Sequence, residues 1–128
     1  MSPSSADRCS VLVVEDNEAL RHTILDYAAS LGCEAWQAAN GLEALWIVKH
    51  HRPTLVLLDL TMPRLDGEQT MREIQAIKPD VRVVIMSGYD QQSLTERFAG
   101  LGPAGFLQKP FQPATLRKTL DQVLALRE

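Results

Sequence analysis

The sequence lacks the long apolar segments and the strong charge bias that mark membrane proteins and nucleic-acid-binding proteins. Its uncharged apolar stretches are strand-sized, well short of the roughly 20 residues that span a bilayer. Its first residues, MSPSSADR, contain no apolar core of a signal peptide. The formal net charge is -3, so no basic footprint for nucleic acid is present. These absences predict a cytoplasmic chain that binds neither membranes nor nucleic acids, with residues 1–8 as a flexible lead-in.

Cysteine is scarce as well. Cys9 and Cys33 form neither a CxxC motif nor a metal-ligand spacing, and both lie near the starts of the first two predicted strands. Because cytosolic thiols are kept reduced, we expect both to be free, buried or half-buried thiols. The histidines, His22, His50 and His51, share no ligand spacing with nearby acids or thiols, so we expect them on helix surfaces.

Glycine-rich phosphate loops are also missing. Neither GxGxxG nor GxxxxGK[ST] occurs in the sequence. The loop after the first apolar run is EDNEAL instead, and its two leading acids would repel a nucleotide phosphate unless a metal ion intervened. A flavin or nucleotide binder is therefore disfavoured.

The length of 128 residues fits a single domain, and the composition, 45% hydrophobic and 23% charged, is typical of a globular protein. Short apolar runs alternate with amphipathic segments of helical period. The runs predict strands at 9–15, 34–39, 54–60, 81–87 and 104–109. The amphipathic segments predict helices at 17–32, 40–53, 66–79, 90–102 and 113–128.

A strand–helix unit that repeats five times predicts parallel strand pairing with right-handed crossovers. Strands that are apolar on both faces fit a sheet covered by helices on both sides. We therefore predict an α/β, doubly wound (βα)5 three-layer sandwich formed by a single domain over residues 9–128.

The stretch LVLLDLTMP, residues 55–63, places Asp59 at the end of a run that reads as a fully buried strand. A carboxylate there costs stability unless it is paired or functional. In a parallel sheet, ligands bind at the carboxyl ends of the strands. The ends of the other strands carry Glu15 and Asp16, Ser87, and Lys109, whereas the second strand ends in small residues and is expected to contribute nothing.

Three carboxylates in one place repel one another unless a proton or a cation offsets their charge. A hard divalent ion such as Mg²⁺ suits oxygen ligands in an open site. Together with a lysine and a hydroxyl, this set favours transfer of a phosphoryl group onto a carboxylate oxygen, with Asp59 as the best nucleophile.

Each residue also has an ordinary structural explanation. Glu15 and Asp16 could simply begin a helix, where the helix dipole favours acids. Asp59 could cap the segment that follows it, and both Ser87 and Lys109 could be turn residues. The placement of all of them at the ends of four strands of one sheet favours the functional interpretation.

The segments VLVVEDN, LLDLTMPRLDG, VVIMSGY and GFLQKPF resemble the receiver domains of two-component response regulators. The resemblance covers nearly the whole chain, and it implies a flavodoxin-like sheet with strand order 2-1-3-4-5. It implies that Asp59 accepts a phosphoryl group from a phosphohistidine of a partner. The implied metal is Mg²⁺ or Mn²⁺, bound by Asp16, Asp59 and the backbone carbonyl of Thr61, with Glu15 acting through a water molecule.

The resemblance implies roles for further residues. Lys109 would pair with the phosphoryl oxygens, and its peptide bond to Pro110 would be cis. Ser87 and Phe106 would be switch residues that move on phosphorylation and remodel the surface formed by the fourth helix, the last strand and the last helix. Thr61 and Tyr89 border the site, where family members vary and the phosphoryl lifetime is tuned.

Several alternatives stay open at the level of sequence. MSGYD and FAGLGPAGFLQKPF are similar to receivers joined to hybrid histidine kinases, so the chain is either a stand-alone receiver or part of such a kinase. A receiver would catalyse its own phosphorylation and dephosphorylation, with a sensor histidine kinase or a histidine phosphotransfer protein as partner and a possible homodimer. A degenerate receiver that serves as a protein-interaction module is the main alternative. An aspartyl phosphatase is disfavoured because Thr61 stands where the second acid would be.

Overall fold

The structure, a computed structural model, describes residues 9–62 and 66–125. The predicted flexible lead-in, residues 1–8, and the last residues of the final predicted helix lie outside the described residues.

Five strands and five helices alternate along the described chain. The strands are β1 (Ser10–Val14), β2 (Glu34–Ala38), β3 (Leu55–Asp59), β4 (Arg82–Ser87) and β5 (Gly105–Gln108). The helices are α1 (Glu18–Ser30), α2 (Gly41–His51), α3 (Gly67–Ile77), α4 (Gln91–Arg97) and α5 (Pro113–Ala125). All strand pairs are parallel, and the sheet order is β2-β1-β3-β4-β5. The predicted flavodoxin-like fold and its strand order are confirmed.

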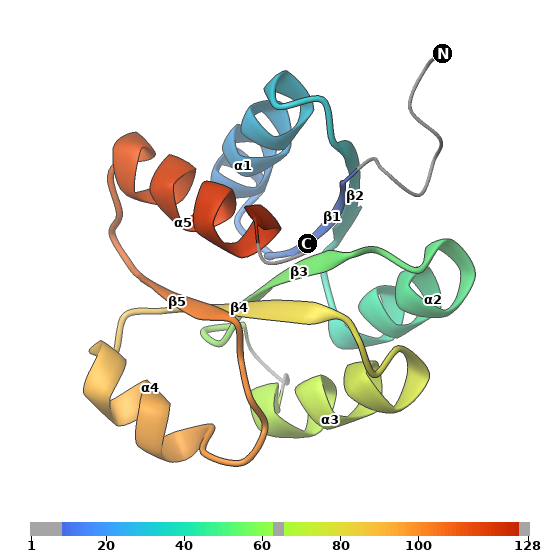
Figure 1. The fold of residues 1–128 in the computed structure, drawn as a ribbon, viewed down its shortest axis with the longest axis vertical. Helices are drawn as coiled ribbons and strands as arrows, with labels where there is room; N and C mark the ends of the chain where they lie inside the picture. Colours follow the sequence, from blue (N-terminus) through green and yellow to red (C-terminus); the bar gives the residue numbers. More distant parts are fainter. Residues whose placement is uncertain (1–8, 63–65, 126–128) are drawn as a thin grey trace.

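The helices form two layers around the sheet (Figure 1). Helices α1 and α5 cover one face, and α2, α3 and α4 cover the other. Each face has its own hydrophobic core, because the strand side chains alternate between the two sides. This arrangement leaves the two ends of the strands as the uncovered edges of the sheet.

Strand β3 lies at the centre, between β1 and β4. Its residues Leu55 to Leu58 have no exposed surface, as expected of a strand that is apolar on both faces. Leu57 lies level with Val13 on one side and with Val84 on the other. The central position places Asp59, the last residue of β3, in the middle of the carboxyl edge.

Polar side chains cap the helices at the carboxyl edge. The side chains of Asn17, Asn40, Asp66 and Asp90 each accept a hydrogen bond from a backbone N–H in the first turn of the helix that follows.

Helix α4 is shorter than the predicted segment 90–102, since it ends at Arg97 and the chain then turns. Gly100 and Gly102 adopt positive φ angles in that turn, which other residues rarely do.

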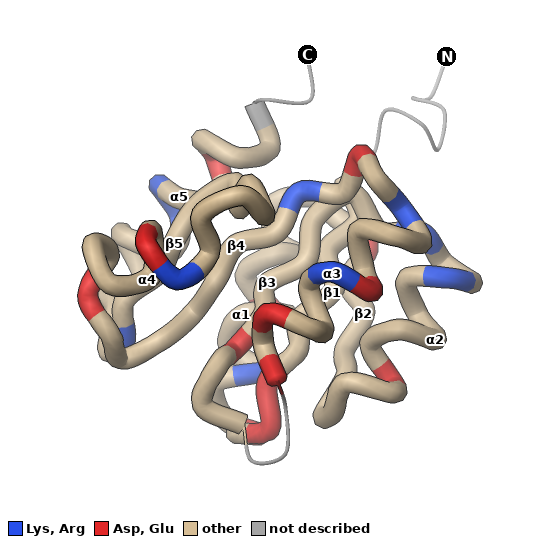
Figure 2. The backbone as a smooth tube through the Cα atoms, turned by 90° about the horizontal axis from the view of Figure 1, so that it is seen from below, with Lys and Arg blue, Asp and Glu red and all other residues tan. Residues whose placement is uncertain are grey.

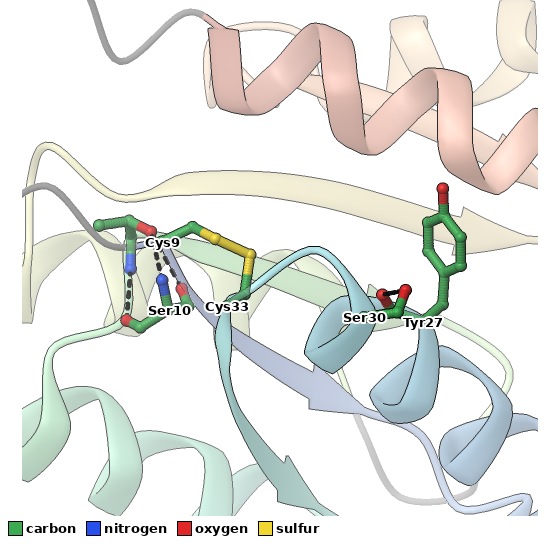
Figure 3. The surroundings of a disulfide bond; sticks show 6 residues. Cys9, Ser10, Tyr27, Ser30 and Cys33 are labelled. Carbon is green, nitrogen blue, oxygen red and sulfur yellow. Dashed lines mark hydrogen bonds between the residues drawn. A yellow bond between two sulfur atoms is a disulfide. The ribbon is translucent and has the colours of Figure 1, made fainter.

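The two cysteines form a disulfide, so the prediction of free thiols is wrong (Figure 3). Ser10 lies level with Glu34 in the β1–β2 pair, which brings the preceding residues, Cys9 and Cys33, to a Cα–Cα distance of 4.7 Å. That separation lies within the range that a disulfide can bridge. The expectation of free thiols rests on the cellular compartment, whereas the pairing of β1 with β2 decides the outcome.

Beside the disulfide, the starts of β1 and β3 are joined by hydrogen bonds. The Thr54 N–H donates to the Ser10 carbonyl over 2.9 Å, the Thr54 hydroxyl donates to the same carbonyl over 3.0 Å, and the Ser10 N–H donates to the Thr54 hydroxyl over 3.1 Å. The amino ends of three neighbouring strands are therefore connected to one another.

The three histidines lie exposed on α1 and α2, as predicted. The His51 ring stacks on Trp36 with a centroid distance of 3.8 Å, and the His50 ring lies 4.3 Å from Trp46.

None of the helices in the described part of the chain is long and apolar enough to span a membrane.

Candidate functional site

The carboxyl edge of the sheet brings together the three predicted carboxylates. Glu15 follows β1 and is 1% exposed, Asp59 ends β3 and is 0% exposed, and Asp16 is exposed. One carboxylate oxygen from each lies within 4.8 Å of the others. Acidic segments gather at this edge, below the label of α1 in Figure 2, while several Lys and Arg segments lie along the opposite edge.

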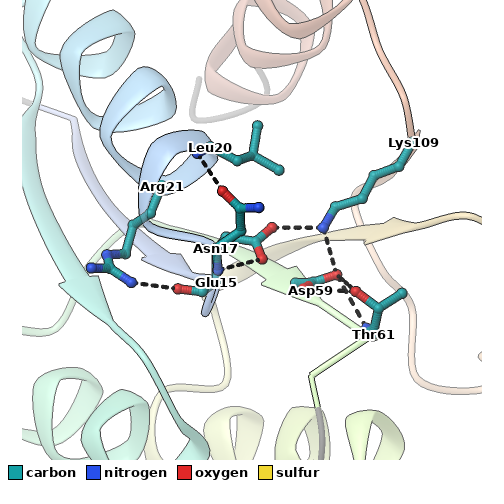
Figure 4. A network of polar contacts seen from close by, with 7 residues as sticks. All are labelled: Glu15, Asn17, Leu20, Arg21, Asp59, Thr61 and Lys109. Atoms are coloured by element: carbon teal, nitrogen blue, oxygen red, sulfur yellow. Dashed lines mark hydrogen bonds and ion pairs between the residues drawn. The ribbon is translucent and has the colours of Figure 1, made fainter.

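Lys109 pairs with both buried carboxylates (Figure 4). Its ammonium nitrogen lies 2.7 Å from Glu15 Oε1 and 3.0 Å from Asp59 Oδ1. The lysine follows β5, and its backbone N–H donates to the carbonyl of Ser87 at the end of β4 over 2.7 Å. Lys109 is therefore fixed at its backbone as well as at its charged end.

Thr61 holds the Asp59 carboxylate from the other side. Its hydroxyl lies 2.9 Å from both Asp59 oxygens, and its N–H donates to Asp59 Oδ1 over 3.1 Å. Oδ1 is thus contacted by Lys109 and by the Thr61 N–H, and the Thr61 hydroxyl contacts both oxygens. Asp59 does not cap α3, because Asp66 does.

The pKa values of the two buried acids move in opposite directions. Burial raises the pKa of Glu15 above its ordinary value; the Lys109 ammonium opposes this rise, and the nearby Asp59 carboxylate adds to it. Burial alone would raise the pKa of Asp59, but hydrogen bonds with Glu15, Lys109 and Thr61 outweigh it and lower the pKa. The surroundings thus favour the ionised form of Asp59 more than that of Glu15, which suits a nucleophile.

Lys109 responds to the same cluster. Burial alone would lower the pKa of its ammonium, but the hydrogen bonds to Glu15 and Asp59 raise it above its ordinary value. The amine therefore stays protonated at neutral pH. One fixed positive charge faces three acids, so the cluster has excess negative charge.

The donor set fits a hard divalent cation. All three side chains offer carboxylate oxygens, which Mg²⁺ and Mn²⁺ accept, and no nitrogen or sulfur ligand is part of the cluster that the described residues form. Asp16 is exposed, so the site opens to solvent, as Mg²⁺ requires if it keeps some of its water.

Neither Glu15 nor Asp16 begins α1 as its cap, because the Asn17 side chain accepts from the Leu20 N–H over 2.9 Å. The backbone N–H of Asn17 donates to Glu15 Oε2 over 3.1 Å. The buried Glu15 also pairs with Lys109, so the favourable dipole of α1 does not by itself account for its position.

Strand β2 contributes to the site, contrary to the expectation that it adds nothing. The carbonyl of Ala38 accepts from the Glu15 N–H over 3.1 Å. The Gln37 side chain accepts from Arg21 Nε over 2.7 Å, and Arg21 Nη1 donates to the Glu15 carbonyl over 3.0 Å. Sequence reasoning did not select Arg21 or Gln37, because their meeting depends on how α1 lies across β2.

The predicted switch residues lie on β4 and β5. Ser87 is fully buried, and its hydroxyl oxygen accepts from the N–H of Tyr89 over 3.0 Å. Phe106 is half-buried and packs against the core on the α2, α3 and α4 side. Tyr89 is 61% exposed at the rim. No hydrogen bond joins Ser87 to Asp59 among the described residues.

Two hollows flank these residues. One, of about 430 Å³, lies beside the carboxylates and is lined by Asn17, Leu20, Lys109, Pro110 and Phe111. The peptide bond between Lys109 and Pro110 on its wall is cis. The other, of about 680 Å³, lies beside Phe106 and includes residues of β5 and α5.

Among known protein families, the model of the response regulator receiver domain matches residues 11–121 of this chain. The chain is 33% identical over 117 residues to sporulation initiation phosphotransferase F of Bacillus subtilis (strain 168), and the aligned region covers 91% of this chain and 94% of that protein. It is also 32% identical over 117 residues to the sensor kinase CckA of Brucella abortus (strain 2308), and that aligned region covers 90% of this chain but 12% of the kinase.

Solved structures show the same arrangement. The chemotaxis protein CheY4 of Vibrio cholerae superposes with a TM-score of 0.83 at 26% identity, over 91% of this chain and 98% of that chain. The likeness therefore extends over nearly the whole of both molecules.

Proposed function

The chain belongs to the response regulator receiver family of two-component systems, and on that premise we propose that Asp59 accepts a phosphoryl group from a phosphohistidine of a partner protein. One observation carries this proposal. Asp59 is a fully buried carboxylate at the centre of the carboxyl edge, with Lys109 and Thr61 on its oxygens and two further acids close by.

The residues around Asp59 suit an acyl phosphate better than a structural ion pair. A structural pair would match one acid with one base, whereas here Lys109 is shared by Glu15 and Asp59, and Asp16 adds a third carboxylate. Burying unmatched charge costs stability. Such an arrangement is typical of a site that is completed by a ligand.

Glu15, Asp16 and Asp59 would hold Mg²⁺ or Mn²⁺, and the resemblance adds the backbone carbonyl of Thr61 as a ligand. When bound, the ion would supply positive charge that offsets the charge of the phosphoryl oxygens. The excess negative charge of the cluster supports this assignment.

In the proposed step, Oδ2 of Asp59 attacks the phosphorus of the donor, because Oδ1 is already contacted by Lys109 and by the Thr61 N–H. A phosphorus–oxygen bond forms as the phosphorus–nitrogen bond breaks, and the electron pair of the broken bond returns to the imidazole nitrogen. The Lys109 ammonium pairs with a phosphoryl oxygen of the product. Later attack of water on phosphorus returns the Asp59 carboxylate and inorganic phosphate, with Thr61 and Tyr89 at the rim.

The donor would approach along the hollow lined by Asn17, Leu20, Pro110 and Phe111. Its lining is largely apolar and lies directly beside Lys109, so a partner helix could pack there while presenting its histidine. A sensor histidine kinase or a histidine phosphotransfer protein has the required chemistry.

Phosphorylation would act through Ser87 and Phe106. Added charge at Asp59 attracts the Ser87 hydroxyl away from the Tyr89 N–H that it accepts from. Phe106 would then move inward, and the surface of α4, β5 and α5 would shift toward a second conformation. That surface is the proposed site for a regulated partner or for a homodimer in the cytoplasm.

Relatives of two architectures support two contexts for this unit. The chain spans 94% of the Bacillus phosphotransferase but only 12% of the Brucella sensor kinase. The first suggests a stand-alone receiver in a phosphorelay, and the second a receiver joined to a histidine kinase. The chemistry proposed for Asp59 is the same in both.

The proposal is tested by incubating the protein with acetyl phosphate and Mg²⁺ and measuring its intact mass. We expect one added phosphoryl group in the parent, none in Asp59→Ala, and none in the parent when EDTA is present during the incubation. Uptake by Asp59→Ala would refute Asp59 as the acceptor. A parent that binds Mg²⁺ but takes no phosphoryl group from acetyl phosphate or from a phosphorylated histidine kinase would favour the interaction module instead.

A further inference from the structure

Glu15 is held at every polar group. Its N–H donates to Ala38, its carboxylate pairs with Lys109 and accepts from the Asn17 N–H, and its carbonyl accepts from Arg21 over 3.0 Å. The Arg21 bond is the one that fixes the carbonyl, and the same peptide unit begins the backbone of Asp16. The direction of this carbonyl therefore decides how the Asp16 backbone is presented.

The Asp16 side chain has no such support. It is exposed, and no hydrogen bond or ion pair holds its carboxylate among the described residues. The carboxylate nevertheless lies within 4.8 Å of those of Glu15 and Asp59. Its position is therefore set by its backbone, between the Glu15 carbonyl on one side and the capping residue Asn17 on the other.

Arg21 reaches this backbone from α1 (Figure 4), and the Gln37 side chain on β2 orients it. Nε donates to Gln37 Oε1 over 2.7 Å while Nη1 donates to the Glu15 carbonyl. The planar guanidinium uses two edges at once, so the Gln37 contact fixes the direction in which Nη1 points. A lysine ammonium has three donors that rotate about one nitrogen, so it lacks the fixed fork that reaches two separate acceptors in one orientation.

We propose that Arg21, oriented by Gln37, is a positioning residue that holds the Glu15–Asp16 peptide so that the Asp16 carboxylate faces the divalent-cation site. The inference rests on the proposed function, because it assigns Arg21 a part in the metal site of that function. Arg21 touches neither the reacting atoms nor the cation ligands' carboxylates; it acts through the backbone.

The positive charge of Arg21 and its positioning role predict opposite changes in Mg²⁺ affinity. A positive side chain near a cation site repels the cation, so an effect of charge alone would make Mg²⁺ bind more tightly when Arg21 is neutralised. Positioning predicts the opposite sign, because a freer Asp16 backbone must be ordered when the ion binds. The direction of the change in affinity therefore separates the two explanations.

The test is a calorimetric Mg²⁺ titration of the intact protein and its variants. We expect Arg21→Met to weaken Mg²⁺ binding about 5-fold, less than the roughly 10- to 100-fold typical of groups bonded directly to a ligand's side chain. Gln37→Leu should weaken it about 2-fold, since Arg21 remains but is less well oriented. Arg21→Lys keeps the charge and should fall between the parent and Arg21→Met.

Arg117→Met is the matched control, because Arg117 is an exposed arginine on α5, and this helix packs against β5 at the other edge of the sheet from β2. It should bind Mg²⁺ as the parent does. Thermal melts in EDTA show whether each variant is folded. If Arg21→Met does not fold, the exposed Gln37 supplies the deciding variant.

A second readout separates positioning from general damage. With acetyl phosphate as donor, the Mg²⁺ concentration for half-maximal phosphorylation should rise about 5-fold in Arg21→Met, while the rate at saturating Mg²⁺ stays within about 2-fold of the parent. Mg²⁺ affinity that is unchanged or tighter in Arg21→Met overturns the inference, as does equal weakening in Arg117→Met. If the parent binds Mg²⁺ but is never phosphorylated, the proposed function fails, and the titration still decides the role of Arg21.

Discussion

At the carboxyl end of the sheet the chain buries Glu15 and Asp59 beside one lysine, whereas at the amino end it joins Cys9 to Cys33 and ties Ser10 to Thr54. Both ends belong to the same parallel strands and lie against the same two cores. The carboxyl end accepts unmatched buried charge, which costs stability. The amino end carries a crosslink and satisfied backbone groups, which stabilise the fold.

This difference shows that the fold tolerates destabilising groups at the carboxyl end of the sheet. Parallel strands present their carboxyl ends to the loops that lead into the helices, so groups that must meet a ligand gather there. The amino ends carry no comparable cluster of metal-ligating side chains among the described residues, and the groups found there join the strands to one another. Changes at the two ends should therefore separate function from stability.

The largest effect on stability is expected at the amino end. The disulfide closes a loop with a sequence separation of 24 residues, so Cys9→Ser should lower the free energy of unfolding of the oxidised protein by about 3 kcal/mol. Urea denaturation measures the change, and a reducing agent should produce the same loss in the parent. Phosphoryl uptake at saturating Mg²⁺ should not change. Equal midpoints for oxidised and reduced parent would contradict a stabilising role.

A smaller loss is expected at the carboxyl end. Lys109→Met leaves Glu15 and Asp59 without their shared cation, and we expect a loss of about 2 kcal/mol in EDTA, reduced because Glu15 can take up a proton. Mg²⁺ should recover part of this loss, since it binds the folded state. Lys118→Met, at an exposed position on α5, is the control and should change little. The idea fails if Lys109→Met is as stable as the parent in EDTA.

Mg²⁺ binding should also depend on pH. Because the pKa of Glu15 is raised, its carboxyl group takes up a proton more readily than an ordinary glutamate as the pH falls, and this proton competes with the cation. Calorimetry at pH 8 and at pH 5.5 should show affinity that is weaker at the lower pH by about 3-fold or more. Glu15→Gln should reduce this dependence. Affinity that rises as the pH falls would contradict the assignment.

The smallest effect concerns the core between α1 and α5. The Tyr27 hydroxyl is buried without a hydrogen-bond partner among the described residues, and its ring points from α1 toward the α5 side in Figure 3. Tyr27→Phe removes this unsatisfied group, so stability should stay constant or rise by up to about 1 kcal/mol. Thermal denaturation measures it, and a clear loss would show that the hydroxyl has a partner in solution.

The sequence was sufficient to predict the sheet and the gathering of acids, for a simple reason. Apolar runs separated by amphipathic segments imply parallel strands, and parallel strands bring Glu15, Asp59 and Lys109 to one edge whatever the details of packing. Only the positions at the ends of strands were needed.

Features that depend on contacts between elements were missed or mispredicted. Arg21 reaches Gln37 only because α1 lies across β2 at a particular place, and nothing in the spacing of EALRH encodes that. The cysteine pair was recoverable in principle, because strands 1 and 2 were expected to be neighbours and both cysteines were placed near their starts. Cellular redox conditions favour free thiols, but the pairing of the two strands brings the cysteines within bonding distance.

The central claim is that Asp59, and neither of its acidic neighbours, carries the phosphoryl group. Borohydride reduces an acyl phosphate of aspartate to homoserine, and peptide mass spectrometry then locates the reduced residue. After incubation with acetyl phosphate and Mg²⁺, the account predicts homoserine at position 59 and unmodified Glu15 and Asp16. Reduction at position 16, or phosphoryl uptake that leaves Asp59 unmodified, would contradict it.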